Sequence, residues 1–486
     1  MTTKTIEIGE FTLKRVQEYV WEMPQEGDMR VPARVLASEE LLSEIKEDKT
    51  LTQLHNTTQL PGIQEYALCM PDGHQGYGFP VGGVAGIDAE DGCISPGAVG
   101  YDINCGVRMV KTNLRYEDIQ GTEEDLVNAL FANVPTGLGG GGVVNNAPVE
   151  EILERGVEWA VEEGYGVETD LAHCEDEGFR AEADATAVSQ KAKDRGRNQA
   201  GSLGSGNHFL EVQRVTDIYD DNVAAEFGLS KDQIVVLIHC GSRGLGHQVC
   251  TDYLRDIEQT HEGLLNQLPD KELAAAPAGS RLAEEYYRAM CGAINFAWTN
   301  RQLITHQTRQ VFERVFDRSW QEMEMELLYD VSHNIAKKEL HTIDGEQKEL
   351  FVHRKGATRA FPAGRPELPP AYRDVGQPVI IPGSMGAGSY ILRGGEQSLD
   401  ETFGSTAHGA GRLMSRTQAK SEYWGEDVMD DLREQNQIYV KAESGATVAE
   451  EAPGVYKDID DVVTVSDTLG IGDKVARTYP VCNIKG

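Results

Sequence analysis

The chain has 486 residues, 40% of them hydrophobic and 7% aromatic, which is typical of a globular protein with a sizeable core. Its strongest apolar run, Ile234–Ile238, is far too short to cross a bilayer, and Met1–Phe11 lacks the basic and apolar pattern of a secretory signal. We therefore expect a soluble protein of the cytoplasm with no membrane partner.

The charge balance is strongly acidic, with 45 Lys and Arg against 79 Asp and Glu and a net charge of −34. Such a charge argues against nucleic-acid binding, which depends on cations that neutralise phosphate. Adaptation to a salt-rich cytoplasm, as in a halophilic archaeon, is the alternative, because the Debye length falls to ~3 Å at 1 M salt. We favour adaptation to salt because the acids are spread along the whole chain, and we expect stability to rise with added KCl.

Periodicity predicts the main elements in chain order. Apolar residues at helical spacing predict helices over Ser38–Lys46, Val149–Glu163, Gln248–Leu265 and Arg281–Arg318. Short Val- and Ile-rich runs bounded by turn residues predict strands over Ile234–His239, Val379–Ile381 and Asp461–Val465. This order has no regular βαβ repeat, which argues against a doubly wound sheet.

Glycine-rich and chemically reactive segments occur along the entire chain, and no low-complexity linker separates them. A single site that draws on all of them requires one compact domain over residues 1–486. The loop Gly137–Gly142 lacks a following Gly-Lys-Ser/Thr, so we interpret it as a mobile surface loop and not as a P-loop.

Five side chains form a candidate metal site. Asp102 and Cys105 share a turn, His208 follows a glycine loop, His239 ends a predicted strand, and His333 lies in a polar segment. Each alone is more often a structural residue, but together they offer one carboxylate, one thiolate and three imidazoles. A thiolate can bridge two cations, and two cations can clamp a phosphoryl transfer. This ligand set does not select the metal, because imidazole and thiolate also suit zinc, cobalt and nickel.

The other cysteines are expected to be reduced and neutral, since the eight cysteines include no Cys-x-x-Cys pair and the chain is long for a disulfide scaffold. Cys240, beside His239, is interpreted as a small packing residue.

Two further segments are typical of a nucleotide site. Pro382–Ser389 can offer backbone N–H groups and small hydroxyls to phosphate or to a purine edge. His408–Arg412 places an imidazole among small residues, and an unprotonated imidazole is a competent nucleophile toward phosphorus. From this pentapeptide alone, a His408 that caps or packs near a helix start explains the pattern equally well.

These segments, in this order, resemble the RtcB family of RNA-splicing ligases over nearly the full length, from Pro71–Gly78 to Ile484–Gly486. Any one motif is weak, but seven in the same order are specific. The resemblance implies an α+β fold, a single large domain with mixed and antiparallel sheets around a di-metal and nucleotide cleft.

The resemblance also implies roles for individual residues. Asp102, Cys105 and His208 would hold one Mn²⁺, and Cys105, His239 and His333 a second. His408 would be the guanylylated nucleophile, with Asp72 orienting it. GTP would be bound by Asn207, His208, Phe209, Leu210, Glu211, His333, Asn334, Pro382, Gly383, Ser384, Met385, Ser389, His408, Gly409, Ala410, Gly411, Tyr456 and Lys485. Glu211 would accept guanine N–H groups, and the candidate RNA-phosphate contacts are Arg195, Arg197, Arg243 and Arg412. For Arg195 and Arg197, surface solubility or helix charge pairing is an equal alternative.

The implied activity is GTP- and manganese-dependent joining of RNA ends with a 3′-phosphate or 2′,3′-cyclic phosphate to 5′-hydroxyl ends. It would proceed through a GMP-histidine and an RNA-ppG end, in tRNA splicing and RNA repair. The expected partners are tRNA halves and, as a candidate, an archease-like activator protein. Two alternatives stay open: a di-metal cyclic phosphodiesterase or phosphatase that does not ligate, and a non-catalytic RNA-end binding factor.

Overall fold

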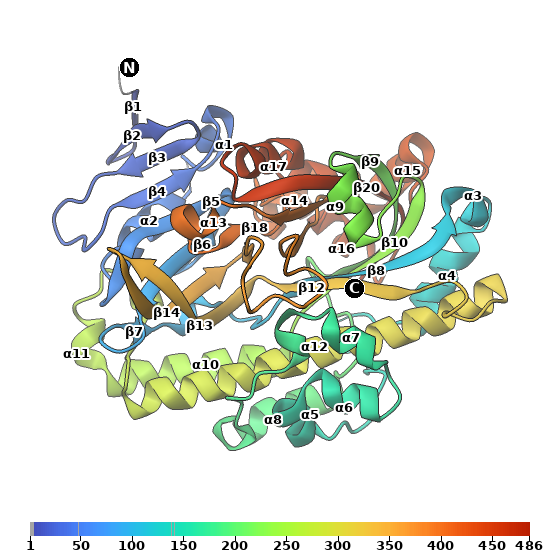
Figure 1. The fold of residues 1–486 in the computed structure, drawn as a ribbon, viewed down its shortest axis with the longest axis horizontal. Coiled ribbons are helices and arrows are strands. Elements are labelled where there is room, and N and C mark those ends of the chain that lie inside the picture. The colour runs from blue at the N-terminus through green and yellow to red at the C-terminus, as the bar shows by residue number, and fades with distance from the viewer. Residues whose placement is uncertain (1–3, 47, 138, 140) are drawn as a thin grey trace.

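Two eight-stranded sheets form the framework of the structure, a computed structural model that describes residues 4–46, 48–137, 139 and 141–486 (Figure 1). In the first sheet all neighbours are antiparallel except β4 and β5. Its strands, in spatial order, are β1 (Thr5–Ile8), β2 (Phe11–Gln17), β3 (Val20–Met23), β4 (Ala33–Leu36), β5 (Ile63–Tyr77), β6 (Phe79–Asp88), β14 (Glu346–Lys355) and β13 (Asn334–Ile343).

The second sheet carries the segments that the sequence marked as reactive. Its strands, in spatial order, are β12 (Glu326–Ser332), β8 (Gly106–Arg115), β10 (Gln233–Cys240), β9 (Phe209–Ile218), β20 (Gly472–Lys485), β17 (Ser389–Gly394) and β16 (Pro378–Ile381). All of these pairs are antiparallel, and β19 (Tyr439–Ala442) adds to β20 in parallel. Two short ribbons complete the strands: β7 (Cys93–Ile94) with β11 (Ala276–Pro277), and β15 (Ala357–Arg359) with β18 (Ser405–Ala407).

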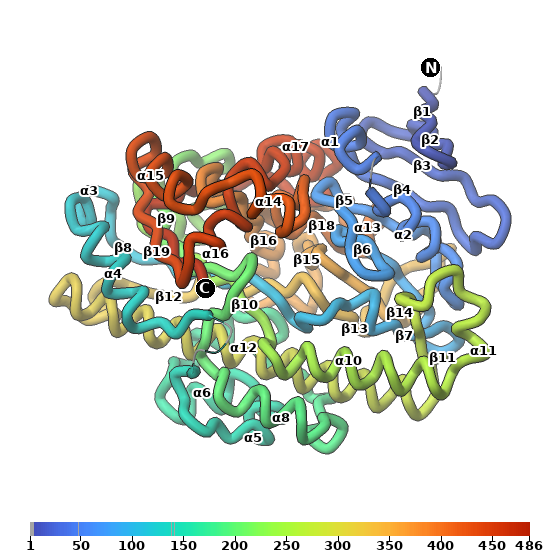
Figure 2. The backbone as a smooth tube through the Cα atoms, turned by 180° about the vertical axis from the view of Figure 1, so that it is seen from behind, coloured from blue at the N-terminus to red at the C-terminus, as the bar shows by residue number. Residues whose placement is uncertain are grey.

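Helices cover the outer faces of this framework. The α-helices are α1 (Glu39–Glu44), α2 (Thr50–Thr57), α3 (Tyr116–Ile119), α4 (Glu123–Asn133), α5 (Val149–Arg155), α6 (Val157–Glu162), α7 (Glu168–Ala172), α8 (Gln190–Arg197), α9 (Asp221–Phe227), α10 (Arg243–Thr260), α11 (Glu262–Leu265), α12 (Arg281–Phe316), α13 (Ser398–Thr402), α14 (Arg416–Glu422), α15 (Gly425–Asn436), α16 (Gly445–Glu450) and α17 (Ile459–Thr468). The 3₁₀ turns are η1 (Pro96–Ala98), η2 (Glu175–Gly178), η3 (Ala185–Ala187), η4 (Lys271–Leu273) and η5 (Pro453–Val455). Figure 2, seen from behind, shows α14, α15 and α16 gathered near the C-terminus.

The long helix α12 organises one core. It has 36 residues and starts where the Ser280 side chain accepts a hydrogen bond from the Ala283 N–H. Side chains on most of its faces are buried between Tyr286 and Phe312, which fits a helix enclosed by protein. Figures 1 and 2 show α10 and α12 running beneath the sheets, with α5, α6 and α8 below them.

Most predicted elements are confirmed, with shifted bounds. The helix predicted over Val149–Glu163 divides into α5 and α6 at Gly156, which has φ 56° and ψ −136°. The helix predicted from Gln248 begins earlier, at Arg243, and is interrupted after Thr260. The predicted loop Gly137–Gly142 includes residues 138 and 140, which lie outside the described residues.

The predicted strand Asp461–Val465 is wrong, because this segment lies inside helix α17. The side chain of Asp458 accepts a hydrogen bond from the Asp460 N–H at 2.8 Å and so caps the helix. The buried residues follow helical spacing: Ile459, Val462, Val463, Val465 and Ser466. The Asp458 cap and the helical spacing of the buried residues together outweigh the preference of Val462 and Val463 for a strand.

The predicted α+β class, with mostly antiparallel sheets around a cleft, is confirmed. Among the described residues, no helix is both long enough and apolar enough to span a membrane.

Candidate active site

Four strands of the second sheet bring the predicted metal ligands to one edge. Cys105 directly precedes β8 and His208 directly precedes β9, whereas His239 lies near the end of β10 and His333 directly follows β12. Because these neighbours are antiparallel, the starts of β8 and β9 meet the ends of β10 and β12. Ligands as far apart in sequence as Cys105 and His333 therefore converge through strand pairing.

A buried arginine of α12 fixes the loops at this edge. The Arg301 guanidinium donates to the carbonyl oxygens of Asn104 at 2.9 Å and Cys240 at 2.7 Å. It also forms a fully buried ion pair with Asp330 at 2.8 Å, and Asp330 pairs in turn with Arg108 at 2.7 Å. Each buried charge thus has a partner, and the turns that carry the ligands are held on both sides.

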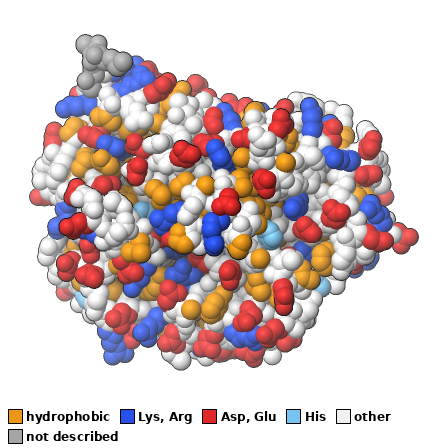
Figure 3. Space-filling view, in the orientation of Figure 1, with side chains coloured by type: hydrophobic (Ala, Val, Ile, Leu, Met, Phe, Trp, Pro, Cys, Tyr) orange, Lys and Arg blue, Asp and Glu red, His pale blue; other side chains and the backbone are white. Residues whose placement is uncertain are grey.

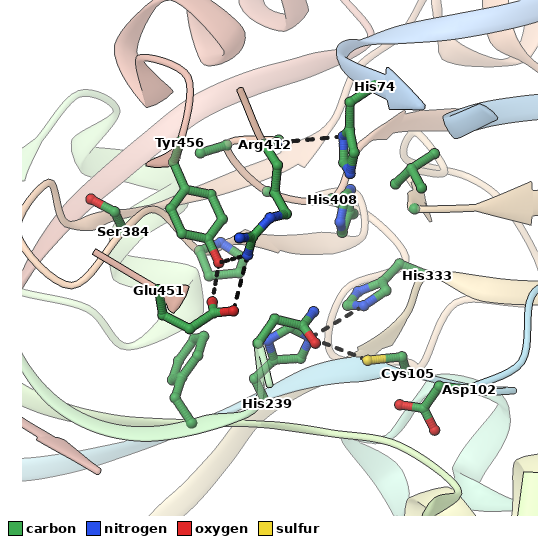
Figure 4. A pocket seen from close by; sticks show the side chains of 18 of the residues that line it. His74, Asp102, Cys105, His239, His333, Ser384, His408, Arg412, Glu451 and Tyr456 are labelled. Atoms are coloured by element: carbon green, nitrogen blue, oxygen red, sulfur yellow. Dashed lines mark hydrogen bonds and ion pairs between the residues drawn. The ribbon is translucent and has the colours of Figure 1, made fainter. Parts of the chain in front are cut away.

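The ligands form two groups that share one sulfur. Figure 4 shows Asp102, Cys105, His239 and His333 close together, with His408 nearby. Asp102, Cys105 and His208 make the first group, Cys105, His239 and His333 the second, and the donor atoms in each lie within 4.8 Å of one another. The Cys105 Sγ lies 3.5 Å from His208 Nε2 and 3.3 Å from His239 Nε2. The Nε2 atoms of His239 and His333 are 3.3 Å apart.

The donor chemistry fits divalent cations. The Nδ1 of His208 lies 2.9 Å from the Leu203 carbonyl oxygen and donates to it, which leaves Nε2 unprotonated and 2.9 Å from Asp102 Oδ2. Two acceptors at that distance are stabilised by a cation between them. The donor atoms of each group lie close enough together, within 4.8 Å, for one cation to contact all three.

Burial sets the protonation of the second group. It lowers the pKa of His239 and of His333 well below the usual range, so both imidazoles are neutral and can offer a lone pair. Burial, together with the Asp102 charge, raises the pKa of the Cys105 thiol well above its usual range. A bound cation would be the group that holds this sulfur as a thiolate.

His408 lies directly against this cluster, as the predicted mechanism requires. Its ring centroid is 4.8 Å from that of His333. Its Nδ1 lies 2.5 Å from Asp72 Oδ2, and the same oxygen accepts the His408 backbone N–H at 3.0 Å. Asp72 thus fixes the Nδ1–H tautomer and leaves the lone pair on Nε2, the atom required of a nucleophile.

A pocket joins His408, four of the five candidate metal ligands and most of the predicted nucleotide residues. The predicted residues that line it are Asn207, Phe209, His333, Asn334, Pro382, Gly383, Ser384, Met385, His408, Gly409, Ala410, Gly411, Tyr456 and Lys485. A small apolar cluster from α14 to α16 packs behind Met385 and supports this wall.

The comparisons with known proteins agree with this geometry. A family model described as "tRNA-splicing ligase RtcB" matches residues 53–486. The chain belongs to the RtcB family. A "tRNA-splicing ligase RtcB" of Thermococcus kodakarensis is 54% identical over 477 residues, which is 98% of this chain and 99% of the relative. Proteins with the same name from Archaeoglobus fulgidus and Aeropyrum pernix are each 51% identical, over 98% and 97% of this chain and 99% of each relative.

Four predicted nucleotide residues of this RtcB-family chain lie outside the pocket lining: His208, Leu210, Glu211 and Ser389. His208 belongs to the metal group, and Ser389 Oγ accepts from the Gly383 N–H at 3.4 Å behind the wall. Glu211 is buried, and its carboxylate accepts hydrogen bonds from Gln213 and Asn483. Burial raises the pKa of Glu211 to about 7.

The predicted RNA-contact arginines occupy different environments. Arg243 is buried and packs beside a candidate metal ligand, with Nη1 3.2 Å from His208 Nδ1 and Nε 3.4 Å from Ser202 Oγ. Arg412 lines the pocket and pairs with Glu451 at 2.9 Å. Arg195 is exposed and donates to Gln248 at 3.2 Å, and Arg197 is half-buried.

Several site residues escaped the sequence reasoning. Glu451 is buried and contacts Arg412, the Tyr456 hydroxyl and Lys485, but in an acidic chain its position in sequence carries no signal. Lys355 lines the pocket, and burial lowers its pKa to about 8. His74 also lines it; burial lowers its pKa to about 4, and its place in the Pro71–Gly78 motif was the available signal.

Proposed function

We propose that this chain is an RNA ligase of the tRNA-splicing type, which uses GTP and Mn²⁺ to join an RNA 3′-phosphate, or a 2′,3′-cyclic phosphate, to a 5′-hydroxyl. The observation that carries the proposal is the position of His408. Its Nδ1 is held by Asp72, and its ring lies 4.8 Å from that of His333 at the edge of the metal ligands. An oriented imidazole beside the metal ligands and the pocket suits covalent transfer of a nucleotidyl group, a step that hydrolysis alone does not require.

In the first step the Nε2 lone pair of His408 attacks the α-phosphorus of GTP. A nitrogen–phosphorus bond forms, the bond to the bridging oxygen breaks, and pyrophosphate leaves. Positive charge develops on the imidazole, and Asp72, 2.5 Å from Nδ1, stabilises it. Asp72 is fully buried, which strengthens this interaction.

A 2′,3′-cyclic phosphate must first take up one water, which breaks its P–O2′ bond and gives a 3′-phosphate and a 2′-hydroxyl. In the second step an oxygen of the RNA 3′-phosphate attacks the phosphorus of the adduct, and the bond to Nε2 breaks. His408 returns to its neutral form, and the RNA ends in a diphosphate linked to guanosine. In the third step the 5′-hydroxyl of the other strand attacks the RNA phosphate, releasing its proton and GMP. The phosphate in the new linkage therefore comes from the broken RNA.

The chain's own residues position these groups. The loop Pro382–Met385 lines one wall of the pocket. Lys485 and Arg412 supply cationic groups on the same wall, and Glu451 holds both of them. Manganese ions held by the two ligand groups would offset the negative charge that builds up on the phosphates.

The test is transfer of label from α-labelled GTP to the protein in the presence of manganese. We expect wild-type protein to become labelled and His408→Ala to remain unlabelled. His306→Ala, an imidazole outside the pocket lining, is the matched control and keeps the label. Labelling of His408→Ala would remove His408 as the nucleophile.

A nicked RNA with 3′-phosphate and 5′-hydroxyl ends separates the remaining alternatives. A ligase seals it and releases pyrophosphate, a hydrolase frees inorganic phosphate without an adduct, and a binding factor consumes no GTP. We propose tRNA halves in the cytoplasm as the natural substrates, and an archease-like protein as a candidate activator whose effect the same assay measures.

A further inference from the structure

Three aromatic rings from distant segments form a row beside the metal ligands. Tyr77 ends β5, Tyr101 lies between η1 and Asp102, and His247 lies on α10. The ring centroids of Tyr77 and Tyr101 are 5.4 Å apart, and those of Tyr101 and His247 are 6.1 Å apart with an angle of 27° between planes. We call Tyr77, Tyr101 and His247 the aromatic row.

The row opens to solvent at both ends and to the pocket in the middle. Tyr77 is 36% exposed and His247 is also exposed, whereas Tyr101 is half-buried and lines the pocket. Aromatic side chains normally bury most of their area, so a contiguous exposed group at a pocket mouth indicates a binding surface.

The backbone beneath the row is firmly held. The buried Lys355 ammonium donates to the carbonyl oxygens of Tyr77 at 2.5 Å and Gly97 at 3.1 Å. The Gly78 N–H donates to Glu272 at 2.7 Å, so that carboxylate is already engaged. On the other side, Asn334 donates to the carbonyl oxygen of Asp102, next to Tyr101, at 3.2 Å. Tyr77 and Tyr101 are thus presented by fixed segments and not by a frayed loop.

The charges around the row suit a nucleic-acid strand. Arg195 donates to Gln248, which follows His247 on α10, at 3.2 Å, and Asp102, His208 and Arg243 also lie near His247. Of these, Arg195 is exposed and Arg243 is buried against His208. One exposed cation beside exposed rings is the combination that binds single strands, by phosphate contact and base stacking.

Stacking also resolves the conflict between the acidic chain and an RNA substrate. At a net charge of −34, long-range attraction of phosphate is unfavourable and salt screens what remains. Stacking of a base on an aromatic face depends little on salt and accepts any base.

We propose that the aromatic row is a stacking subsite for an unpaired RNA base next to the reacting end. This inference rests on the proposed RNA-ligase function and adds to it a sequence-tolerant contact that keeps its strength in high salt. Tyr101, on the pocket wall beside Asp102, is the central ring of the subsite.

The test is binding of a short fluorescent single-stranded RNA with 5′-hydroxyl and 3′-phosphate ends, with manganese and without GTP, over a range of KCl. Tyr101→Ala and His247→Ala should each bind about tenfold more weakly at every salt concentration. The slope of log affinity against log salt should stay unchanged, whereas Arg195→Ala should reduce it by about 0.7. Tyr101→Phe keeps the ring and should bind like wild type.

The matched control is Tyr219→Ala, because Tyr219 is 48% exposed and stacks on Tyr390 at 6.1 Å, yet lies outside the pocket lining. Binding by Tyr101→Ala and His247→Ala at the level of Tyr219→Ala would overturn the inference. Since Tyr101 adjoins a metal ligand, manganese content is measured in every variant, and His247→Ala decides the result if Tyr101→Ala loses metal.

A series of RNAs that each lack one base identifies the contact. Removal of the stacked base should weaken binding to wild type about tenfold and leave binding to Tyr101→Ala unchanged, because the two losses are the same interaction. If removal of each base weakens binding to Tyr101→Ala as much as it weakens binding to wild type, no base stacks on this ring. Labelling of wild-type protein by α-labelled GTP, without RNA, tests the ligase proposal separately. Failure of the stacking inference can therefore be distinguished from failure of the proposed ligase function.

Discussion

At the residue scale, Cys105 connects the two ligand groups, because its Sγ lies 3.5 Å from His208 Nε2 and 3.3 Å from His239 Nε2. Cys105→Ala should therefore lose both bound manganese ions and not one, as measured by elemental analysis of the purified protein. Cys240→Ala is the control, since Cys240 is also a buried thiol but its sulfur accepts a hydrogen bond from Asn300. Two metals retained in Cys105→Ala would exclude the bridging role.

Glu211 makes the stability depend on pH. Burial raises its pKa from 4.5 to about 7, with Lys485 acting in the opposite direction. A carboxyl whose pKa is raised by folding stabilises the fold fully below about pH 4.5, and that contribution is lost as pH rises to 7. The loss is at most about 3 kcal/mol.

Glu211→Gln should remove this dependence, because the amide resembles the protonated acid at every pH. We expect the free energy of unfolding of wild type to fall from pH 5 to pH 8 and that of the variant to stay nearly constant. Urea unfolding of both proteins at both pH values measures this difference. An equal difference between the two proteins at both pH values would show that Glu211 does not titrate in this range.

At the element scale, the loop before β9 sets the first metal group through Arg243. A Cβ on Gly204 would lie 1.8 Å from Arg243 Nη1, and Gly204 has φ +94°. Gly204→Ala should displace the Arg243 guanidinium, which packs beside His208, and the resulting shift of this loop should weaken manganese binding about tenfold. Titration calorimetry measures the affinity.

The control for Gly204→Ala is Gly279→Ala, which has a similar backbone strain at φ +73° but open space around the added carbon. If both variants bind manganese like wild type, the Arg243 contact does not support the site. If both weaken equally, backbone strain and not displacement of Arg243 is the cause.

Local elements were predictable where periodicity and caps agree, as in α12, whose apolar spacing and Ser280 cap give its start. A short apolar run was ambiguous and could not be assigned with the same success. Val462 and Val463 favour a strand, but the Asp458 cap stabilises the helix α17. Strand order was beyond reach, because the pairing of β12 with β8 joins segments far apart in sequence.

The candidate site likewise contains residues that the sequence indicates and residues that only the fold brings together. His239 was predictable because it ends an apolar run, and His208 because it follows a glycine loop. His333 was predicted only as part of the set of ligand types and from the family resemblance. Glu451 and Arg301 were not, since their roles depend on contacts between distant segments: Glu451 with Arg412 and Lys485, and Arg301 with the Asn104 and Cys240 carbonyls.

At the scale of the whole molecule, the net negative charge predicts a stability that depends on salt. Figure 3 shows acidic and basic side chains interspersed over one face, and the net charge is −34. Burial raises the pKa of Asp461 at the start of α17, and the neighbouring acids Asp458, Glu40 and Asp460 raise it further, so like charges contribute to the shift. Since the Debye length falls from ~8 Å at 0.15 M to ~3 Å at 1 M salt, added salt relieves this repulsion.

The melting temperature should therefore rise as KCl is increased from 0.1 to about 1 M, followed by calorimetry. Asp461→Asn should melt higher than wild type in dilute buffer and gain less from KCl. A wild-type melting temperature that is highest in dilute buffer would contradict adaptation to salt.

The central claim is that two cations, sharing the Cys105 sulfur, lie beside a histidine that becomes covalently guanylylated. Crystals grown with manganese and GTP, with anomalous diffraction recorded at the manganese edge, test it in one measurement. We predict two anomalous peaks, one among Asp102, Cys105 and His208 and one among Cys105, His239 and His333, and continuous density from His408 Nε2 to the phosphorus of GMP. Manganese peaks elsewhere, or a nucleotide bonded to another residue, would contradict the account.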